Sequence, residues 1–367
     1  MKKDCILLAV LALLLAGLWL LPSPVLLERE TGSLVRVKIL SADNSDLQKH
    51  GLLLYGSQHL KLKLPDGSLR DGNNELRAQI ELDKLFKPGD TALAVFTPEG
   101  VMTVKDHFRT HWIFILTGTF SLFLLFFGGW TGFKALFSFA VSCVAVWKGL
   151  LPLVLLGWNG SVASFVCTFF LTAAIIFAVA GFNRKGIAAF CGSMAGVVCS
   201  LLLAYIFTWV MKLNGAVLPF AQTLLYSGYD TINLRDLFTG ALVLGCAGAV
   251  MDLAMDIAAG VEEVHRHSPG LSGKELMLSG FRIGRSVTGT MTTTLLLAYS
   301  GGYITLLMMF YAQGTPPLEF INNPLVASEI VKTLVGSFGL VLVAPFTAIF
   351  SAWLYTAKKT QKYTQNS

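Results

Sequence analysis

Charged residues are scarce in this chain of 367 residues: only 14% are Asp, Glu, Lys or Arg, whereas 54% are hydrophobic. A soluble domain carries about 25% charged residues, so this composition argues against one and indicates a protein of the lipid bilayer. No basic stripe with interleaved aromatic side chains is present, so we expect no nucleic-acid partner. The net charge of +6 belongs to residues that flank apolar runs.

Cysteine is scarce too: five of its six copies fall within apolar runs, and the sixth, Cys5, immediately precedes the first run. Segment 28–110 contains none, which argues against a disulfide framework there. No nucleotide-binding motif is recognisable. His107 and His111 are four apart, but without a nearby cysteine or carboxylate they make a poor metal site. We therefore expect no cofactor, no metal and no enzymatic activity.

Long apolar runs are abundant, by contrast. Runs of about 18 residues or more predict about eight transmembrane helices, near 6–27, 112–130, 133–157, 160–180, 187–211, 237–260, 283–312 and 329–356. Lysine and arginine gather in alternate connections, and the short loops 157–160 and 313–327 contain neither. The positive-inside rule therefore places both termini in the cytoplasm, which agrees with an even number of spans.

The predicted fold is an α-helical polytopic membrane protein with a small extracytoplasmic β domain after its first helix. Residues 1–27 have a basic start and no convincing cleavage site, so we interpret them as an uncleaved transmembrane anchor. The β domain covers 28–110, a seven-helix membrane domain covers 111–357, and 358–367 form a cytoplasmic tail.

Segment 28–110 alternates apolar and basic side chains at 35–39 and again at 60–64. This period of two is typical of half-buried strands, and Gly- and Pro-containing turns separate the runs. Five or six short strands predict a small antiparallel β-barrel, of which an OB-like barrel is one form. Such a module would pack on the membrane part or bind another envelope protein.

Two carboxylates lie inside the sixth run. Asp252 and Asp256 share one helical face with the small residues Ala241, Gly245, Gly248 and Ala259. An ionisable group at membrane depth is expensive, so it tends to face protein or water and to serve a function. Carboxylates one turn apart are prone to share a proton or bind a cation. We therefore predict that Asp252 couples ion movement, with Asp256 assisting.

The seventh run supplies candidate partners for these carboxylates. Arg285 lies at the depth of Asp256, where the two would form an ion pair, and Asp252 lies level with Thr288, Thr290 and Thr292. Lys148 in the third run is a rival partner for Asp252. The alternative interpretation is structural, because ion pairs and threonine hydroxyls also tie membrane helices together.

Glycines predict close helix packing and one helix break. The expected packing positions are Gly192 and Gly196, which form a GxxxG step, together with Gly245, Gly248 and Gly289. In the seventh run Gly284, Gly289 and the pair Gly301-Gly302 interrupt a segment whose first half is mostly polar. This pattern predicts a broken or re-entrant helix, a feature of transporter binding sites.

The chain resembles the YibE/F family of bacterial polytopic membrane proteins along nearly its whole length. The strongest likeness is in GCAGAVMDLAMDIAAGVEEV and SPGLSGKELMLSGFRIGRSVTGTMTTTLLLAY, and GFNRKGIAAFCGSMAGV, GSFGLVLVAPFTA and KPGDTALAVF also fit. The family pattern has asparagine where Thr293 stands and often serine near Asp256. The resemblance therefore implies shared roles for Asp252, Arg285, Gly289 and Thr290, in an inner or plasma membrane protein presumed to be a transporter.

These observations lead to a secondary transporter or permease as the expected function, moving an unidentified small solute or ion and coupled to ions or protons through the aspartates. The alternative is a membrane scaffold or sensor whose exported β domain binds an envelope partner. An intramembrane hydrolase is disfavoured, because Asp252 and Asp256 lie on one helix. The other expected partner is the bilayer itself, in a multi-pass arrangement in the bacterial cell membrane.

Overall fold

The computed structural model describes residues 34–80, 82–96 and 102–364, and a few positions between 9 and 20. Beyond residue 356 it describes the backbone alone. The chain divides into two compact units, one of Val25–Phe126 and one of Met1–Pro24 with Phe127–Ser367. The predicted anchor at 1–27 lies largely outside the described residues.

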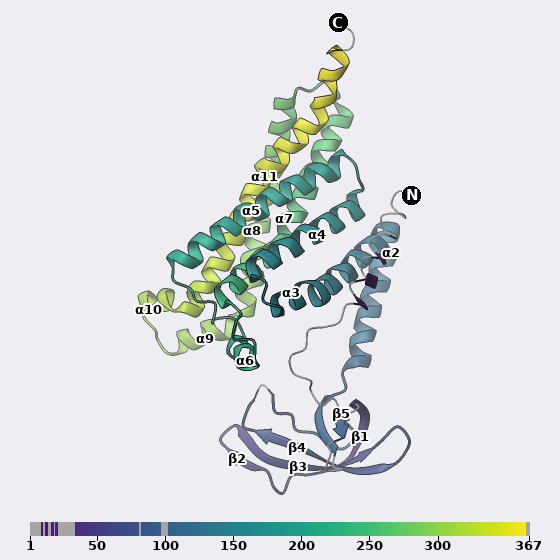
Figure 1. Ribbon diagram of the computed structural model, residues 1–367, viewed down its shortest axis with the longest axis vertical. Helices are drawn as coiled ribbons and strands as arrows, with labels where there is room; N and C mark the ends of the chain where they lie inside the picture. Colours follow the sequence, from purple (N-terminus) through teal and green to yellow (C-terminus); the bar gives the residue numbers. More distant parts are fainter. Residues whose placement is uncertain are drawn as a thin grey trace. The chain divides into compact units, whose positions relative to one another are not determined.

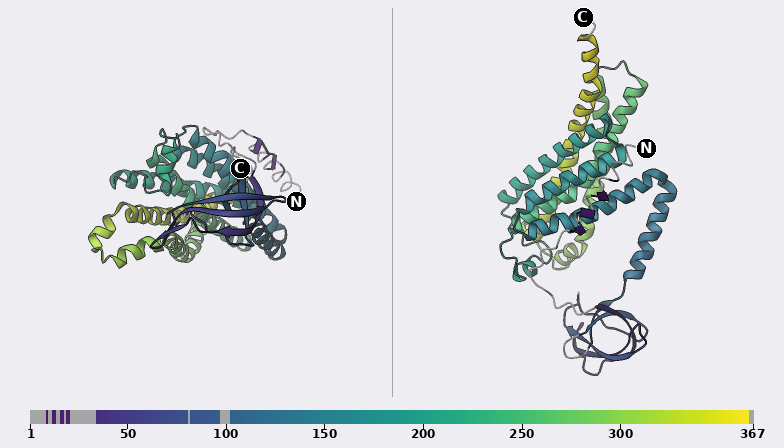
Figure 2. Two further views of the ribbon diagram at one scale, coloured as in Figure 1. Left: turned by 90° about the horizontal axis from the view of Figure 1, so that it is seen from below. Right: turned by 45° about the vertical axis from the view of Figure 1, so that its right-hand side comes forward.

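The first unit contains a closed β-barrel. Its strands are β1 (Leu34–Asp43), β3 (Leu53–Lys63), β4 (Leu69–Arg77), β5 (Thr91–Phe96) and β6 (Met102–His107). They follow the order β1-β5-β6-β4-β3, and β3 pairs again with β1, so the sheet closes on itself, as the right-hand view of Figure 2 shows. The short β2 (Gln48–His50) extends the sheet from β3. The predicted barrel is present, but it is not wholly antiparallel, because β4 and β6 pair in parallel.

The alternation at 35–39 and 60–64 sets the inside of this barrel. Val37, Ile39, Leu60 and Leu62 are buried in its core, while the lysines between them face outward. Gln58 is buried as well, and its amide donates to the carbonyl oxygen of Phe86 over 2.8 Å. A buried amide without a partner would lose the hydrogen bond that it makes to water in the unfolded chain. The bond to Phe86 therefore offsets the cost of burying Gln58.

The remaining elements are helical: α2 (Thr110–Val144), the π-helical turn η1 (Ala145–Leu150), α3 (Leu151–Leu155), α4 (Gly160–Ala180), α5 (Arg184–Val210), α6 (Ala221–Tyr226), α7 (Leu234–His267), α8 (Gly273–Gly302), α9 (Ile304–Ala312), α10 (Pro317–Asn322) and α11 (Pro324–Thr364). In Figure 1, α5, α7, α8 and α11 run side by side, and α6, α9 and α10 gather at one end of this bundle.

Five stretches of the described chain are long and apolar enough to cross a bilayer, and the bent pair α8–α9 makes a sixth. Eight were predicted. The first falls largely outside the described residues, and the second and third fall together in Thr110–Leu155. Gly129 interrupts that stretch with φ 50° and ψ −126°, a conformation that no helix interior adopts. The predicted break in the seventh run is confirmed, because α8 and α9 meet at an angle of 66°.

The helical bundle carries large apolar side chains on its outer surface, and small hydroxyl side chains lie among the apolar residues of its core. Phe170, Leu202 and Trp353 are more than half exposed, whereas Thr172 and Ser193 are fully buried. A water-soluble bundle has the opposite arrangement, since burial of apolar surface drives its folding. The pattern is consistent with a membrane protein, whose helices pack through small residues.

Gly192 and Gly196 permit a close helix contact in this unit. A Cβ atom on Gly192 would overlap Thr347 of α11, and one on Gly196 would lie 3.0 Å from the Cβ of Val343. The GxxxG step therefore lies where α5 and α11 touch. Gly248 and Gly289 differ, because no atom of the described chain lies within 4 Å of a Cβ placed on either.

Candidate functional site

The predicted acidic face of α7 is an open face. Asp252 and Asp256 are both exposed, and so are the small residues Gly245 and Gly248 on the same side of the helix. The opposite face is buried against α4, α5 and α11. An ionised side chain at the centre of a bilayer costs about 2.5–3.5 kcal/mol. This face therefore requires cover from protein or water if the helix spans a membrane.

Arg285 lies at the level of Asp256 but does not pair with it. A Cβ placed on Gly284 of α8 would lie 3.2 Å from Cδ1 of Ile257, the residue after Asp256, so the two helices are in the predicted register. Both side chains are exposed. Yet neither takes part in a salt bridge within the described chain. The two residues therefore lie at the same level of adjoining helices, and the described chain shows no ion pair between them.

The threonine hydroxyls of α8 point back to their own helix. Thr288 donates to the carbonyl oxygen of Gly284 over 2.7 Å, and Thr292 donates to that of Thr288 over 2.8 Å. Thr290 bonds the carbonyl oxygen of Val287 in the same manner. These bonds satisfy the hydroxyl protons locally and leave the oxygen lone pairs as acceptors. They do not join α8 to Asp252.

Lys148 is placed away from Asp252. It lies in η1, which packs against α4, and its Nζ is 5.6 Å from the ring centroid of Trp19. No salt bridge joins it to Asp252 in the part of the chain that the structure describes. The rival pairing is therefore not observed.

A largely buried ion pair that sequence reasoning missed lies on α11. The Nζ of Lys332 is 2.6 Å from Oε1 of Glu329, and both side chains are only 13% exposed. Lys332 also donates to the phenolic oxygen of Tyr303 over 2.8 Å. The second oxygen of Glu329, Oε2, is buried and accepts no hydrogen bond from the described residues. The Tyr303 hydroxyl also interacts with the Glu329 side chain.

Tyr303 stands at the break between α8 and α9, so the ion pair lies beside a bent span. Glu329 lines a cavity of about 330 Å³ between α8, α9 and α11, whose other walls are mostly apolar. The polar groups that reach it are Tyr299, Ser300, Tyr303, Glu329 and Thr333.

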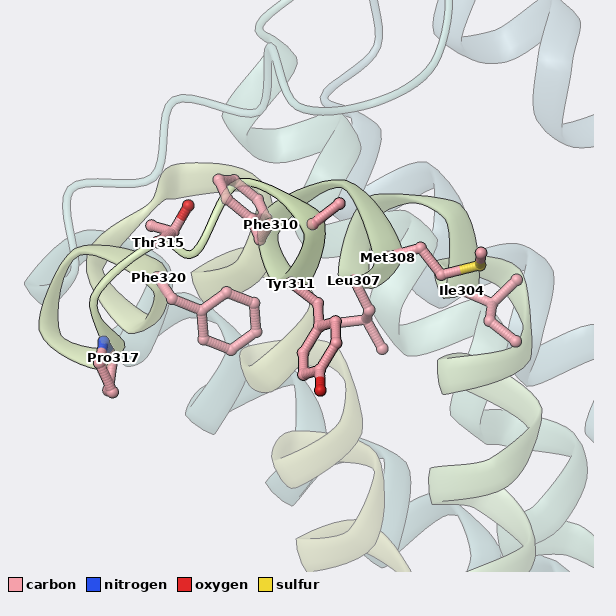
Figure 3. A pocket seen from close by; sticks show the side chains of 9 residues that line it. Ile304, Leu307, Met308, Phe310, Tyr311, Thr315, Pro317 and Phe320 are labelled. Atoms are coloured by element: carbon pink, nitrogen blue, oxygen red, sulfur yellow. The ribbon is translucent and has the colours of Figure 1, made fainter.

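A second cavity, of about 620 Å³, adjoins the first. Figure 3 shows its walls, which come from α9, from α10 and from the turn between them. Leu307 and Phe320 line both cavities. Together the two cavities form a largely apolar space at one end of the bundle, and the Glu329–Lys332 pair borders it.

The model of the family described as YibE/F-like protein matches residues 116–357. The chain belongs to the YibE/F-like family. The match runs from α2 to α11 and includes Asp252, Arg285 and the Glu329–Lys332 pair, whereas the barrel lies before it. Searches of curated proteins and of solved structures gave no match.

In this YibE/F-like chain a signal for the second site was present in the sequence. Glu329 and Lys332 are three residues apart at the start of the last apolar run, in the order EIVK. Charges at the end of a span are ordinarily read as interfacial residues that reach water. Only the position of Tyr303, 29 residues away, shows that they are enclosed.

Proposed function

We propose that this chain is a secondary transporter, and not an enzyme, that moves a small solute across a bacterial inner or plasma membrane. The observation that carries this proposal is the buried Glu329–Lys332 pair, which lies beside the helix break at Tyr303 and borders the 330 Å³ cavity.

Stability alone does not account for such a pair. Replacing a buried ion pair by well-packed apolar residues is often neutral or stabilising, because two charges lose their hydration on burial. Glu329 also keeps an oxygen without a hydrogen-bond donor, which adds to that cost. A charged group held in this state at a broken helix has the properties of a solute or ion site.

The cavity walls narrow the class of solute. They are largely apolar and offer one free carboxylate oxygen. A small solute with an apolar body and one hydrogen-bond donor or positive charge complements this arrangement. A proton is a second candidate ligand of Glu329, since it removes the negative charge and weakens the pair with Lys332.

Coupling to an ion gradient is assigned in this proposal to Asp252, assisted by Asp256. The two carboxylates are one turn apart on the open face of α7, so one proton or one cation relieves their mutual repulsion. This assignment requires that the face be enclosed in the assembled protein.

The test uses the full chain in proteoliposomes that contain a pH-sensitive dye. A panel of small amines, amino acids, carboxylates and cations is added under an imposed proton or sodium gradient. At least one solute should drive a pH or charge signal that Glu329→Gln removes. The matched control is Glu319→Gln, on the exposed α10, which should keep the signal. An equal signal from Glu329→Gln, or none with wild-type protein, would reject the proposal.

The barrel supports a second candidate function, binding of an envelope protein. Strand β2 is exposed at all three residues, and among the described strands it pairs with β3 alone, so its other edge can accept a further strand. Deleting 31–106 separates the two functions. A scaffold would lose its partner in pull-down experiments, whereas a transporter would keep some flux.

A further inference from the structure

A lysine, a glutamate and a tyrosine meet where α5 begins and α7 ends. The Nζ of Lys185 in α5 is 3.0 Å from Oε2 of Glu262 in α7. The hydroxyl of Tyr355 in α11 donates to Oε1 of the same carboxylate over 3.1 Å. We call these three residues the α5–α7–α11 trio. It lies at the end of the bundle away from α9 and α10 (Figure 1), and one carboxylate there ties three helices together.

The Glu329 site at the other end has the same three residue types. Lys332 pairs with Glu329 and donates to Tyr303, and its Nζ lies 5.6 Å from the ring centroid of Phe238, near the start of α7. The helix α11 contributes to both sets, with Glu329 and Lys332 near its start and Tyr355 toward its end. Polar contacts therefore hold α11 at both ends.

The two sets differ in exposure. The side chains of Glu329 and Lys332 are both 13% exposed, whereas those of Lys185 and Glu262 are 25% and 37% exposed. A partly solvated ion pair contributes little net free energy, because water competes for both charges. The α5–α7–α11 trio can therefore break and re-form at a small cost, as a reversible contact must.

The interior beside this trio is closed. Leu276 of α8 is fully buried, and Ala352 of α11 is 5% exposed. Between the trio and the Glu329 cavity, α8 touches α11, because a Cβ on Gly280 would lie 2.7 Å from the Cβ of Ala348. In the state that the structure describes, a solute beside Glu329 therefore has no passage between these two helices toward the trio.

The Glu329 end, in contrast, contains space that reaches the surface of the described chain. The 330 Å³ cavity shares Leu307 and Phe320 with the 620 Å³ cavity, whose wall residue Tyr311 is 90% exposed. A transporter presents one site to each side of the membrane in turn. Space at one end and close contact at the other are what one state of that cycle requires.

The helix α11 has a weak point between its two sets of polar contacts. Pro345 lies inside the helix, between Lys332 and Tyr355. Proline has no N–H to donate to the carbonyl oxygen four residues earlier, so a helix bends most readily there. The two ends of α11 can therefore change direction separately.

We propose that the α5–α7–α11 trio is the gate that closes the solute site at the end that lysine and arginine predict to be cytoplasmic. The proposal rests on the transport function proposed above. The gate opens when the end of α11 pivots at Pro345 away from α7 and α8, which breaks the bond of Tyr355 to Glu262. The Glu329 cavity closes in the same step, because α11 also forms part of its wall.

Reciprocal labelling of the two ends tests this gate without a solute. In a full-length chain whose native cysteines are serine, Ala352→Cys reports on the buried side of the trio and Ser300→Cys reports on the Glu329 cavity. The rate of reaction with a hydrophilic maleimide is measured for each reporter. Glu262→Gln should raise the rate at Ala352→Cys and lower the rate at Ser300→Cys, each by at least about threefold.

Glu263→Gln is the matched control, because Glu263 pairs with Arg266 and His267 of its own helix, and it should leave both rates unchanged. Tyr355→Phe, which removes only the bond from α11, should shift both rates in the same directions as Glu262→Gln. A rise at both reporters is the result of a loosened bundle. That result, or no change at either reporter, would overturn the proposal.

A disulfide that leaves the trio intact covers the case in which these variants do not accumulate. A Cβ on Gly273 of α8 would lie 3.8 Å from the Cβ of Thr356, a separation typical of disulfides. The oxidised pair Gly273→Cys with Thr356→Cys should stop solute flux in proteoliposomes, and reduction should restore it. Either cysteine alone should not respond to oxidation. Undiminished flux in the oxidised pair would contradict the gate.

The gate and the transport function can fail separately. Flux that Glu329→Gln removes, together with unchanged labelling of both reporters, would keep the transporter and reject the gate. Reciprocal labelling without flux of any solute would keep the coupled movement of the two ends and reject transport.

Discussion

Lys332 of α11 donates a hydrogen bond of 2.8 Å to Tyr303, the residue between α8 and α9. This bond fixes the bend of one span to the charged pair of another. A proton or solute that engages Glu329 therefore acts on the same group that holds the bend. A change at this site should therefore alter both the stability of the bend and the occupancy of the cavity.

Replacing only one partner of the Glu329–Lys332 pair should destabilise the protein more than replacing both partners. Lys332→Met leaves a carboxylate with no cation, at a cost of about 3–5 kcal/mol. The double variant Glu329→Leu with Lys332→Met should recover most of this loss. The free energy of unfolding in SDS titrations measures both. Equal losses in the single and double variants would contradict the assignment of the pair as buried and mutually dependent.

Asp252→Asn should leave folding unchanged and abolish ion-driven flux. The side chain is exposed and makes no salt bridge in the described chain, so the amide removes a charge without breaking a contact. Asp230→Asn, in an exposed turn, serves as the control in the same proteoliposomes. Wild-type flux from Asp252→Asn would remove the aspartate from the mechanism.

Adding one methyl group at Gly192 should weaken the contact of α5 with α11. The new Cβ would overlap Thr347, and overpacking of this kind costs about 1–3 kcal/mol. Gly149→Ala is the matched control, since no other described part of the chain lies within 4 Å of its Cβ, and it should change stability by less than about 0.5 kcal/mol. Thermal unfolding of the purified chain distinguishes them; a stable Gly192→Ala variant would show that α11 can shift.

The stability of the folded barrel should depend on pH through His59. Its hydrogen bonds to Asn73 and then Asp46 raise the pKa of the imidazole. Protonation therefore favours the folded barrel, with the full contribution below the unfolded pKa of about 6.5 and a loss as pH rises through the folded pKa. His59→Gln should weaken hydrogen-exchange protection of β3 and β4 at pH 5 but not at pH 9. A loss of equal size at both pH values would exclude the titration.

Much of this architecture follows from local pattern. The period of two placed Val37 and Leu62 inside a barrel, and Gly301-Gly302 marked the break that lies at Tyr303. Helical periodicity also placed Asp252 and Asp256 on one face, because residues three and four apart share a side of the helix. These features need only the order of neighbouring residues.

Other features depend on which neighbour a face meets, and periodicity does not encode this. The level of Asp256 and Arg285 followed from the length of the connection between α7 and α8, but the rotation of each helix about its axis did not. The same holds for Glu329, whose enclosure depends on a tyrosine 29 residues from its lysine partner. Such long-range placement is set by packing of the whole bundle.

Glu329 and Lys332 are one helical turn apart, so they can neutralise each other as soon as the first turns of α11 form. If α11 spans a membrane, its hydrophobic segment can insert as a net-neutral unit, without waiting for the earlier helices to supply a counter-charge. Insertion of that segment would then be uncoupled from the assembly that later encloses it. Separating the two charges along the sequence would make biogenesis, and not only the mature protein, dependent on that assembly.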